Sequence, residues 1–319
     1  MIEVDVSGLR GELLAGLVDC AMDPRRQLTL FLGEARRRAG LWPVALTEAV
    51  ADFASDRDSD GVLIVRGLPV DPVLPPTPTR AGGEVEKQTR VSELCLCAVA
   101  TALGHPVGYR DERAGAVLHD VYPTPANAAQ LSSDSSKSTL GLHTEMAFHS
   151  LLPDYVVLMG LRQDPEREAV TTFAGVRRIL PRISARAKEV LHTTPVAMEI
   201  EYSYAPQARD RAAPLRSVLY GDPADPFFRF DGDLLTAPTP LAQGALDEVA
   251  AAAEVVHGSV RLEPGVLVAL DNRRAVHGRS SFAARYDGGD RWLQRTVVRK
   301  ELPSSADREG DPRIITRFL

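Results

Sequence analysis

The texture of the sequence changes after about residue 105, and this change limits the fold more than any other feature. Beyond it come short extended runs separated by Gly and Pro, such as Asp154–Met159, Val266–Leu270 and Leu293–Val298. Many short strands with turn residues between them indicate an antiparallel sandwich or barrel. Two helices are expected to interrupt this part, over Val176–His192 and Pro240–His257. The pattern therefore predicts a mainly β fold with flanking helices.

The first 105 residues are expected to be mostly helical. Apolar residues recur at three- and four-residue spacing in Arg25–Arg38 and Val44–Phe53, and Val91–Leu103 predicts an apolar helix buried behind a sheet. The β-branched run Gly61–Arg66 predicts one strand. Five prolines in Leu68–Gly83 predict an irregular loop.

No linker separates the helical part from the strands, so we expect a single domain over 1–319. Residues 1–105 would form a helical buttress, and 106–300 a β core with a helical insert. The loop Ala205–Arg216 is expected to close over the site as a lid.

Charge and composition exclude several classes of function. The chain has 37 Lys and Arg against 43 Asp and Glu, a net charge of −6, which argues against nucleic-acid binding. The longest uncharged stretch, Leu94–Tyr109, is too short to span a bilayer. Cys20, Cys95 and Cys97 fit neither a disulfide framework nor a zinc site. We expect a cytoplasmic protein with no nucleic-acid or membrane partner, and the sequence leaves the oligomeric state open.

A His-x-Glu pair and a distant His form the candidate metal site. His143 and Glu145 stand on an expected strand, where residues two apart share a face. His277 comes shortly after another expected strand. Two His and one carboxylate are the facial triad of non-haem Fe(II) oxygenases, which leaves positions open opposite the protein ligands. Alone, a His-x-Glu pair is more often a surface pair or a structural histidine.

Two arginines strengthen the oxygenase interpretation. Arg291 lies fourteen residues after His277, and Arg295 follows four residues later, so a strand would direct both toward the same interior. A guanidinium fork matches a carboxylate in two-point contact, as the distal carboxylate of a 2-oxo diacid requires. The alternative is that both arginines are salt-bridge partners at the rim.

These residues place the chain near a known family. The chain resembles the clavaminate synthase-like branch of the Fe(II)/2-oxoglutarate dioxygenases, which includes free asparagine and arginine hydroxylases. The resemblance covers roughly residues 60–300 and implies a double-stranded β-helix (jelly-roll) core. The segments that carry it are Leu131–Ser133, His143–His149, Pro153–Tyr155, Asp271–Asn272, His277 and Tyr286–Trp292.

The resemblance also implies roles for single residues. His143, Glu145 and His277 would hold Fe(II), and Arg291 would hold the distal carboxylate of 2-oxoglutarate with help from Thr171. The iron, 2-oxoglutarate and O2 would then hydroxylate an sp³ carbon and release succinate.

Substrate contacts follow from the same resemblance. Arg295 would face the α-carboxylate of an amino-acid substrate, and Asp231 would receive its polar or basic end. Further contacts implied for the substrate amine or side chain are Glu112, Ser133 and Asp134. Arginine hydroxylases of this branch have a carboxylate two residues before the position of Asp231, where this chain has Arg229.

The Arg229 departure weakens the case for an arginine substrate. Lysine, asparagine, citrulline-like and carrier-tethered residues remain open, and Asp233 is a candidate to compensate. His149 is interpreted as a hydrogen-bonded structural histidine in preference to a residue that supports the metal ligands.

The resulting hypothesis is a hydroxylase of an amino acid or derivative, acting by default at the β-carbon, in specialised metabolism such as antibiotic biosynthesis. Desaturation or ring closure by the same chemistry stays open. So do two other classes of protein: a zinc hydrolase that uses the same triad, and a non-catalytic metal-binding jelly roll.

Overall fold

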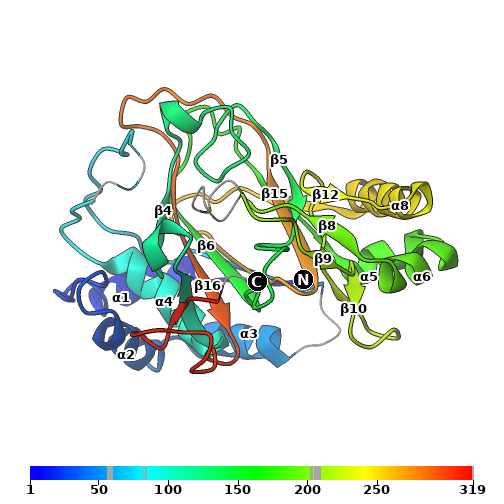
Figure 1. The fold of residues 1–319 in the computed structure, drawn as a ribbon. Coiled ribbons are helices and arrows are strands. Elements are labelled where there is room, and N and C mark those ends of the chain that lie inside the picture. The colour runs from blue at the N-terminus through cyan, green and yellow to red at the C-terminus, as the bar shows by residue number, and fades with distance from the viewer. Residues whose placement is uncertain (56–59, 81, 83–84, 202–203, 205–209, 318–319) are drawn as a thin grey trace.

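The protein is described by a computed structural model that covers residues 1–319 except 56–59, 81, 83–84, 202–203, 205–209 and 318–319. A large sheet and a smaller sheet form its core (Figure 1). The large sheet runs in the order β1-β2-β14-β6-β16-β3-β17, and β4 also pairs with β16. Its strands are β1 (Ile2–Asp5), β2 (Val62–Arg66), β14 (Leu267–Asp271), β6 (Tyr155–Arg162), β16 (Trp292–Arg299), β3 (His105–Tyr109), β17 (Ile314–Ile315) and β4 (His119–Val121).

The smaller sheet is antiparallel and runs β13-β7-β15-β5. Its strands are β13 (Gly258–Val260), β7 (Thr171–Gly175), β15 (Ala275–Arg279) and β5 (Leu140–His143). Two minor sheets lie in the segment between β7 and β13 in the sequence. They comprise β8 (Val196–Met198), β9 (Leu215–Arg216) and β12 (Leu235–Thr236), and the pair β10 (Leu219–Tyr220) and β11 (Phe227–Phe228).

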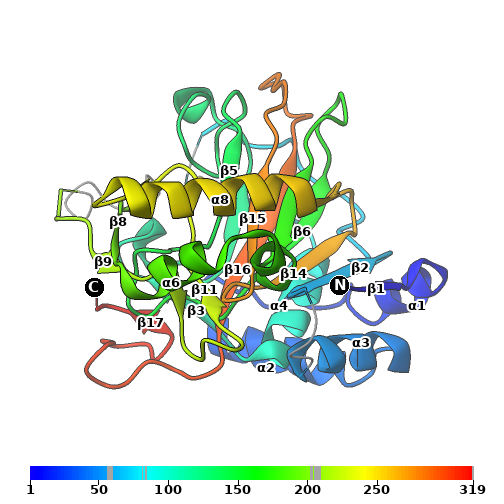
Figure 2. The same ribbon diagram turned by 90° about the vertical axis from the view of Figure 1, so that its right-hand side faces the viewer.

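Helices cover both sides of this core, as Figures 1 and 2 show. The first group packs on the large sheet, where its longest helix, α4 (Val91–Leu103), contacts β16 and β6. The second group lies beside the smaller sheet, where α5 and α8 contact β7. The helices are α1 (Arg10–Ala15), α2 (Leu28–Ala39), α3 (Val44–Ser55) and α4 (Val91–Leu103) in the first group, and α5 (Val176–Ile179), α6 (Ala185–Thr193) and α8 (Pro240–Val256) in the second.

The N-terminal part is more than a helical buttress. β1 pairs in parallel with β2, and β2 pairs with β14, so two N-terminal strands extend the large sheet. Side chains of β2 are buried on both faces: Leu63 and Val65 pack with the N-terminal helices, while Val62 and Ile64 face the core between the sheets. The sequence pattern predicted β2 but not β1.

The helix expected over Val176–His192 is wrong as one element. α5 ends at Ile179, a 3-10 turn follows over Leu180–Arg182, and α6 begins only at Ala185. Pro181 has no N–H to continue an α-helix. Ser184 then caps α6, since its hydroxyl accepts the Ala187 N–H at 3.0 Å.

The other expected helices agree with the structure more closely. Val91–Leu103 is α4 with the same bounds, and α8 and α3 match to within two residues. The first expected helix begins three residues late, at Leu28. In the part of the chain that the structure describes, no helix has the length and apolarity that crossing a membrane requires.

Candidate metal centre and active site

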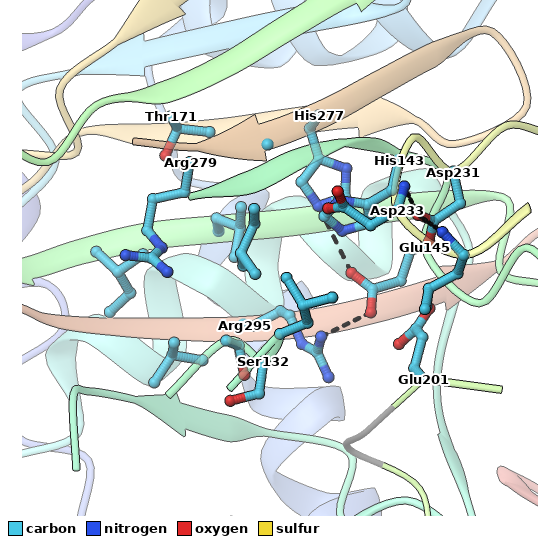
Figure 3. Close-up of a pocket in the computed structure, with 18 of the residues that line it drawn as sticks. Ser132, His143, Glu145, Thr171, Glu201, Asp231, Asp233, His277, Arg279 and Arg295 are labelled. Atoms are coloured by element: carbon cyan, nitrogen blue, oxygen red, sulfur yellow. Dashed lines mark hydrogen bonds and ion pairs between the residues drawn. The ribbon is translucent and has the colours of Figure 1, made fainter. Parts of the chain in front are cut away.

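A cavity lies between the two sheets (Figure 3). Both sheets and the connecting loops contribute to its wall. From the large sheet and its edge come Val121, Leu158, Arg291, Leu293 and Arg295; from the smaller sheet Leu140, His143, Thr171, His277, Gly278 and Arg279; from loops Leu131, Ser132, Ser133, Glu145, Glu201, Asp231, Asp233 and Leu234.

Strand pairing brings the two candidate histidines together. His143 and His277 are direct partners across β5 and β15, and their ring centroids are 4.4 Å apart. Such partners have adjacent side chains on one face of a sheet. Glu145 joins them, with its Oε2 3.6 Å from Nε2 of His277. One ligand atom from each of the three residues lies within 4.8 Å of the others.

Hydrogen bonding orients the first of these rings. Nδ1 of His143 bonds the carbonyl of Gly141 at 2.9 Å, which directs Nε2 away from the backbone. Nδ1 of His277 is buried and has no hydrogen-bond partner among the residues that the structure describes. Burial, followed by the charge of His143, lowers the pKa of His277, which favours the neutral imidazole that a metal needs.

Glu145 reaches the histidines by a route that differs from the expectation. β5 ends at His143, and Glu145 begins a turn in which Met146 has a φ of 55°. Strand alternation therefore does not explain the convergence. Asn272 fixes the backbone instead: its Oδ1 accepts the Glu145 N–H at 2.8 Å, and its Nδ2 donates to the Glu145 carbonyl at 3.0 Å.

Arg295 holds the second oxygen of Glu145. Its Nη1 donates to Glu145 Oε1 at 2.7 Å, and its Nη2 donates to Glu112 Oε1 and to Nδ1 of His119. Because His119 accepts at Nδ1, its Nε2–H donates to the carbonyl of Ala116 at 2.8 Å. Burial lowers the pKa of His119 to about 4, so the ring is neutral at pH 7.

The Arg295 contacts also set the charge of Glu145, the candidate carboxylate ligand. Burial raises the pKa of Glu145, but the charge of Arg295 and the nearby histidines outweighs burial and holds it below its ordinary value. Glu145 is therefore an anion. The expected substrate residues Arg295 and Glu112 thus contact each other, and a substrate carboxylate that reaches Arg295 must compete with acceptors already in place.

Arg279, Arg291 and Thr171 lie at one end of the cavity. Arg291 and Arg295 both line it, as their even spacing predicts, and Thr171 does while Thr172 does not. Arg279, which the sequence analysis did not single out, lies beside Thr171 (Figure 3). Burial, followed by the charge of Arg279, lowers the pKa of Arg291 to about 9.

Three carboxylates occupy the end near the histidines. Glu201, Asp231 and Asp233 line the cavity on the side of His143, opposite Arg279 and Thr171 in Figure 3. Burial raises the pKa of Asp231 and raises that of Glu201 far more, with the charge of Glu145 adding to the second effect. Glu201 gave no sequence signal, because it lies in a loop beyond β8.

The remaining expected contacts lie at the margin of the cavity. Ser133 lines it, but Asp134 is not in its wall and pairs with Nη2 of Arg113 at 2.7 Å. Arg229 also lies outside the wall, with its guanidinium carbon 5.1 Å from the Tyr220 ring centroid. The part of the expected lid over residues 205–209 is outside the described residues.

His149 is a structural histidine, as favoured from the sequence. Its Nδ1 accepts the Leu151 N–H at 3.0 Å, so its Nε2–H donates to the carbonyl of Arg317 at 3.0 Å. The ring packs edge-on against Tyr109 at 4.8 Å. Burial lowers the pKa of His149 to about 4.

Comparison with known proteins gives consistent matches. The family model described as "Taurine catabolism dioxygenase TauD, TfdA family" matches residues 25–297. Clavaminate synthase 2 of Streptomyces clavuligerus is 37% identical over 314 residues, covering 97% of this chain and 96% of that protein.

Solved structures of similar proteins cover nearly the whole chain. Asparagine oxygenase in complex with Fe(II), 2S,3S-3-hydroxyasparagine and succinate superposes with a TM-score of 0.88 at 34% identity, covering 99% of this chain and 100% of that one. The non-heme iron oxygenase OrfP in complex with Fe and alpha-ketoglutaric acid gives a TM-score of 0.82 at 29% identity, with coverages of 98% and 99%.

Proposed function

The chain belongs to the TauD/TfdA dioxygenase family, and on that premise we propose that it hydroxylates an sp³ carbon, by default the β-carbon, of an amino acid or amino-acid derivative. It is an Fe(II)/2-oxoglutarate-dependent dioxygenase of specialised metabolism. The observation that carries the proposal is one cavity that holds a His-Glu-His cluster, a buried arginine and a group of carboxylates. We also propose that the facing sheets are the two halves of a double-stranded β-helix.

The donor set fits ferrous iron. Two imidazoles and one carboxylate suit a divalent ion, and Arg295 leaves Oε2 of Glu145 directed at the histidines while it occupies Oε1. Fe(II) bound to His143, Glu145 and His277 supplies activation of O2, coupled to the oxidative decarboxylation of 2-oxoglutarate to succinate. The protein supplies the binding, orientation and charge around that chemistry.

The residues of the cavity divide the remaining work by charge. Arg291 and Thr171 are proposed to hold the distal carboxylate of 2-oxoglutarate, because a guanidinium fork matches a carboxylate. Asp231 is proposed to receive the polar or cationic end of the substrate, with Ser133 beside it in the wall. Fixing both molecules in one cavity replaces two diffusional encounters with an oriented pair.

The α-carboxylate of the substrate remains assigned to Arg295 as part of this proposal. Arg295 lines the cavity, but its two terminal nitrogens already bond Glu145, Glu112 and His119. A substrate carboxylate must therefore share Arg295 with these groups or displace Glu112, whereupon Glu112 becomes available to a substrate ammonium. Asp134 has the weakest case, since Arg113 engages it outside the wall.

A panel of L-amino acids tests the proposal. Each is incubated with the enzyme, Fe(II), ascorbate and 2-oxoglutarate, and substrate-dependent succinate release is measured together with the mass of the product. We expect a gain of one oxygen in the productive case and no succinate from His143→Ala. A loss of two hydrogens would indicate desaturation or ring closure.

Other outcomes reject the proposal. Turnover that persists without 2-oxoglutarate would indicate a hydrolase that uses the same three ligands. Tight iron binding without succinate from any free or carrier-tethered amino acid would indicate a non-catalytic metal-binding protein.

A further inference from the structure

A second arginine, Arg279, lies beside Thr171 at the proposed co-substrate end of the cavity. Arg279 is on β15, two residues after His277, so both side chains are on the same face of the smaller sheet. Its direct pairing partner on the neighbouring strand β7 is Thr171. Two residues of strand span roughly 6.7 Å. Arg279 and Thr171 thus lie about one strand repeat from His277, a proposed metal ligand. This distance is comparable to the length of a short dicarboxylic acid.

Arg279 and Arg291 share one small region. Both residues are buried, with 5% of Arg279 and 6% of Arg291 exposed. Their guanidinium carbons lie 5.2 Å and 5.9 Å from the centroid of the same ring, Phe282. Arg279 and Arg291 also both belong to the wall of the cavity. The two cations therefore face the same enclosed space from opposite sheets.

Neither arginine forms an ion pair with a carboxylate in the described part of the chain. Arg279 donates only to neutral oxygens: Nη2 to Ser135 Oγ at 2.7 Å and to the Ser138 carbonyl at 3.0 Å, and Nη1 to the Ser280 carbonyl at 3.2 Å. Its buried Nε has no hydrogen-bond partner within the described ranges of the chain. The side chain of Arg291 has no hydrogen bond or ion pair with any described residue, and the charge of the buried Asp164 only partly opposes the effect of burial on its pKa.

Two buried cations that form no ion pair with any described residue are a costly arrangement. Desolvation of an unpaired charge is unfavourable, and the two like charges repel each other. One carboxylate in the space between them would satisfy both, and the cavity is open to receive it. Among the described residues Asp164 is near enough for its charge to act on Arg291, but it forms no ion pair with either arginine, so the space between the two guanidinium groups can take a ligand carboxylate.

We propose that Arg279 is a second binding residue for the distal carboxylate of the co-substrate, opposite Arg291, and that it determines selectivity for a dicarboxylic 2-oxo acid. This inference rests on the proposed function, which assigns that end of the cavity to 2-oxoglutarate. It predicts that Arg279 discriminates between 2-oxo acids with and without a distal carboxylate. A purely structural Arg279, which only ties Ser135 and Ser138 to β15, would not discriminate.

The test compares two acids of equal length. The Mn(II)-loaded protein, without O2, is titrated with 2-oxoglutarate and with 2-oxopentanoate, which lacks the distal carboxylate, and the ratio of the two dissociation constants is the selectivity. Arg279→Gln should reduce the selectivity roughly tenfold or more, as expected for one lost charge-assisted hydrogen bond. Arg279→Lys, which keeps the charge, should retain more of it. The exposed Arg178→Gln is the matched control and should leave it unchanged.

The outcomes separate this inference from the proposed function. If the unaltered protein shows no preference for 2-oxoglutarate, the proposed function fails. A second outcome rejects only the inference about Arg279. In it the unaltered protein prefers 2-oxoglutarate, Arg291→Gln removes that preference, and Arg279→Gln keeps it. Equal weakening of both acids by Arg279→Gln would also overturn that inference, because that result identifies a structural residue.

Discussion

Two buried clusters of charge in this molecule are built in opposite ways. Behind the large sheet, Lys87 Nζ donates to Asp71 at 2.6 Å, to Ser92 at 2.5 Å and to Glu93 at 2.7 Å, all of them buried. In the cavity, Arg291 is just as buried but makes no hydrogen bond or ion pair with any residue that the structure describes.

The difference separates structural charge from charge directed at a ligand. Asp71 also accepts the N–H groups of Val91 and Ser92, so the Lys87 cluster satisfies the start of α4, the helix that supports β6 and β16. Removing one partner there leaves buried charges unpaired. Removing Arg291 breaks no hydrogen bond or ion pair among the described residues, so its loss should be felt mainly when a ligand binds.

The largest effect is expected from Lys87→Met. It leaves Asp71 and Glu93 buried without their cation, which typically costs about 3–5 kcal/mol of folding free energy. Urea denaturation measures this loss. Arg186→Met is the control, because Arg186 and Glu189 form an exposed pair with 63% of each side chain accessible, and such pairs contribute about 0–1 kcal/mol. Equal stability of the Lys87→Met and Arg186→Met variants would contradict the structural role.

Arg291→Gln should reverse that pattern. Without ligand, the urea midpoint should hold or rise, because a buried unpaired cation is removed. The dissociation constant for 2-oxoglutarate on the Mn(II)-loaded protein should rise roughly 10- to 150-fold, from about 1.5–3 kcal/mol for a charge-assisted hydrogen bond. A drop in stability comparable to that of Lys87→Met would show that Arg291 belongs to the structural class.

Local pattern was enough to predict several elements of the fold. α4 was predicted residue for residue, since its apolar run is bounded by polar loops and by Gly104. The helix over Val176–His192 failed because periodicity outweighed Pro181 in the prediction. β1 was missed because four terminal residues carry little pattern, and only pairing with β2 makes them a strand.

The site divides in the same way. His143, Glu145, His277 and Arg291 could be chosen from motif spacing, although Glu145 arrives through a turn and not by alternation. Arg279 could have been predicted from the sequence. Residues an even number apart on a strand share a face, and this holds for His277 and Arg279 as it does for Arg291 and Arg295. Glu201 was not, because only the folded chain brings its loop to the cavity. What Arg295 binds depends on Glu112 and His119, which no spacing relates to it.

The acidic end of the cavity offers the smallest and most specific test. Burial, followed by the charge of Asp233, raises the pKa of Asp231 above its ordinary 3.8 despite the opposing effects of His143 and two backbone N–H groups. A carboxyl whose folded-state pKa is raised destabilises the protein when ionised, and stability is regained as the pH falls through that pKa. Asp231→Asn should therefore stabilise the protein at neutral pH, since an amide oxygen can still accept the N–H groups of Asp233 and Leu234.

The same substitution should weaken the binding of a cationic substrate by about tenfold, which is the contribution of one charge-assisted hydrogen bond. The ratio of the substrate KM values of the variant and the unaltered enzyme should be largest at neutral pH and should approach one as the pH falls and Asp231 takes up its proton. A ratio that does not change with pH would mean that the charge of Asp231 does not contact the substrate, and that the acidic end differs from the arginine end in serving the fold alone.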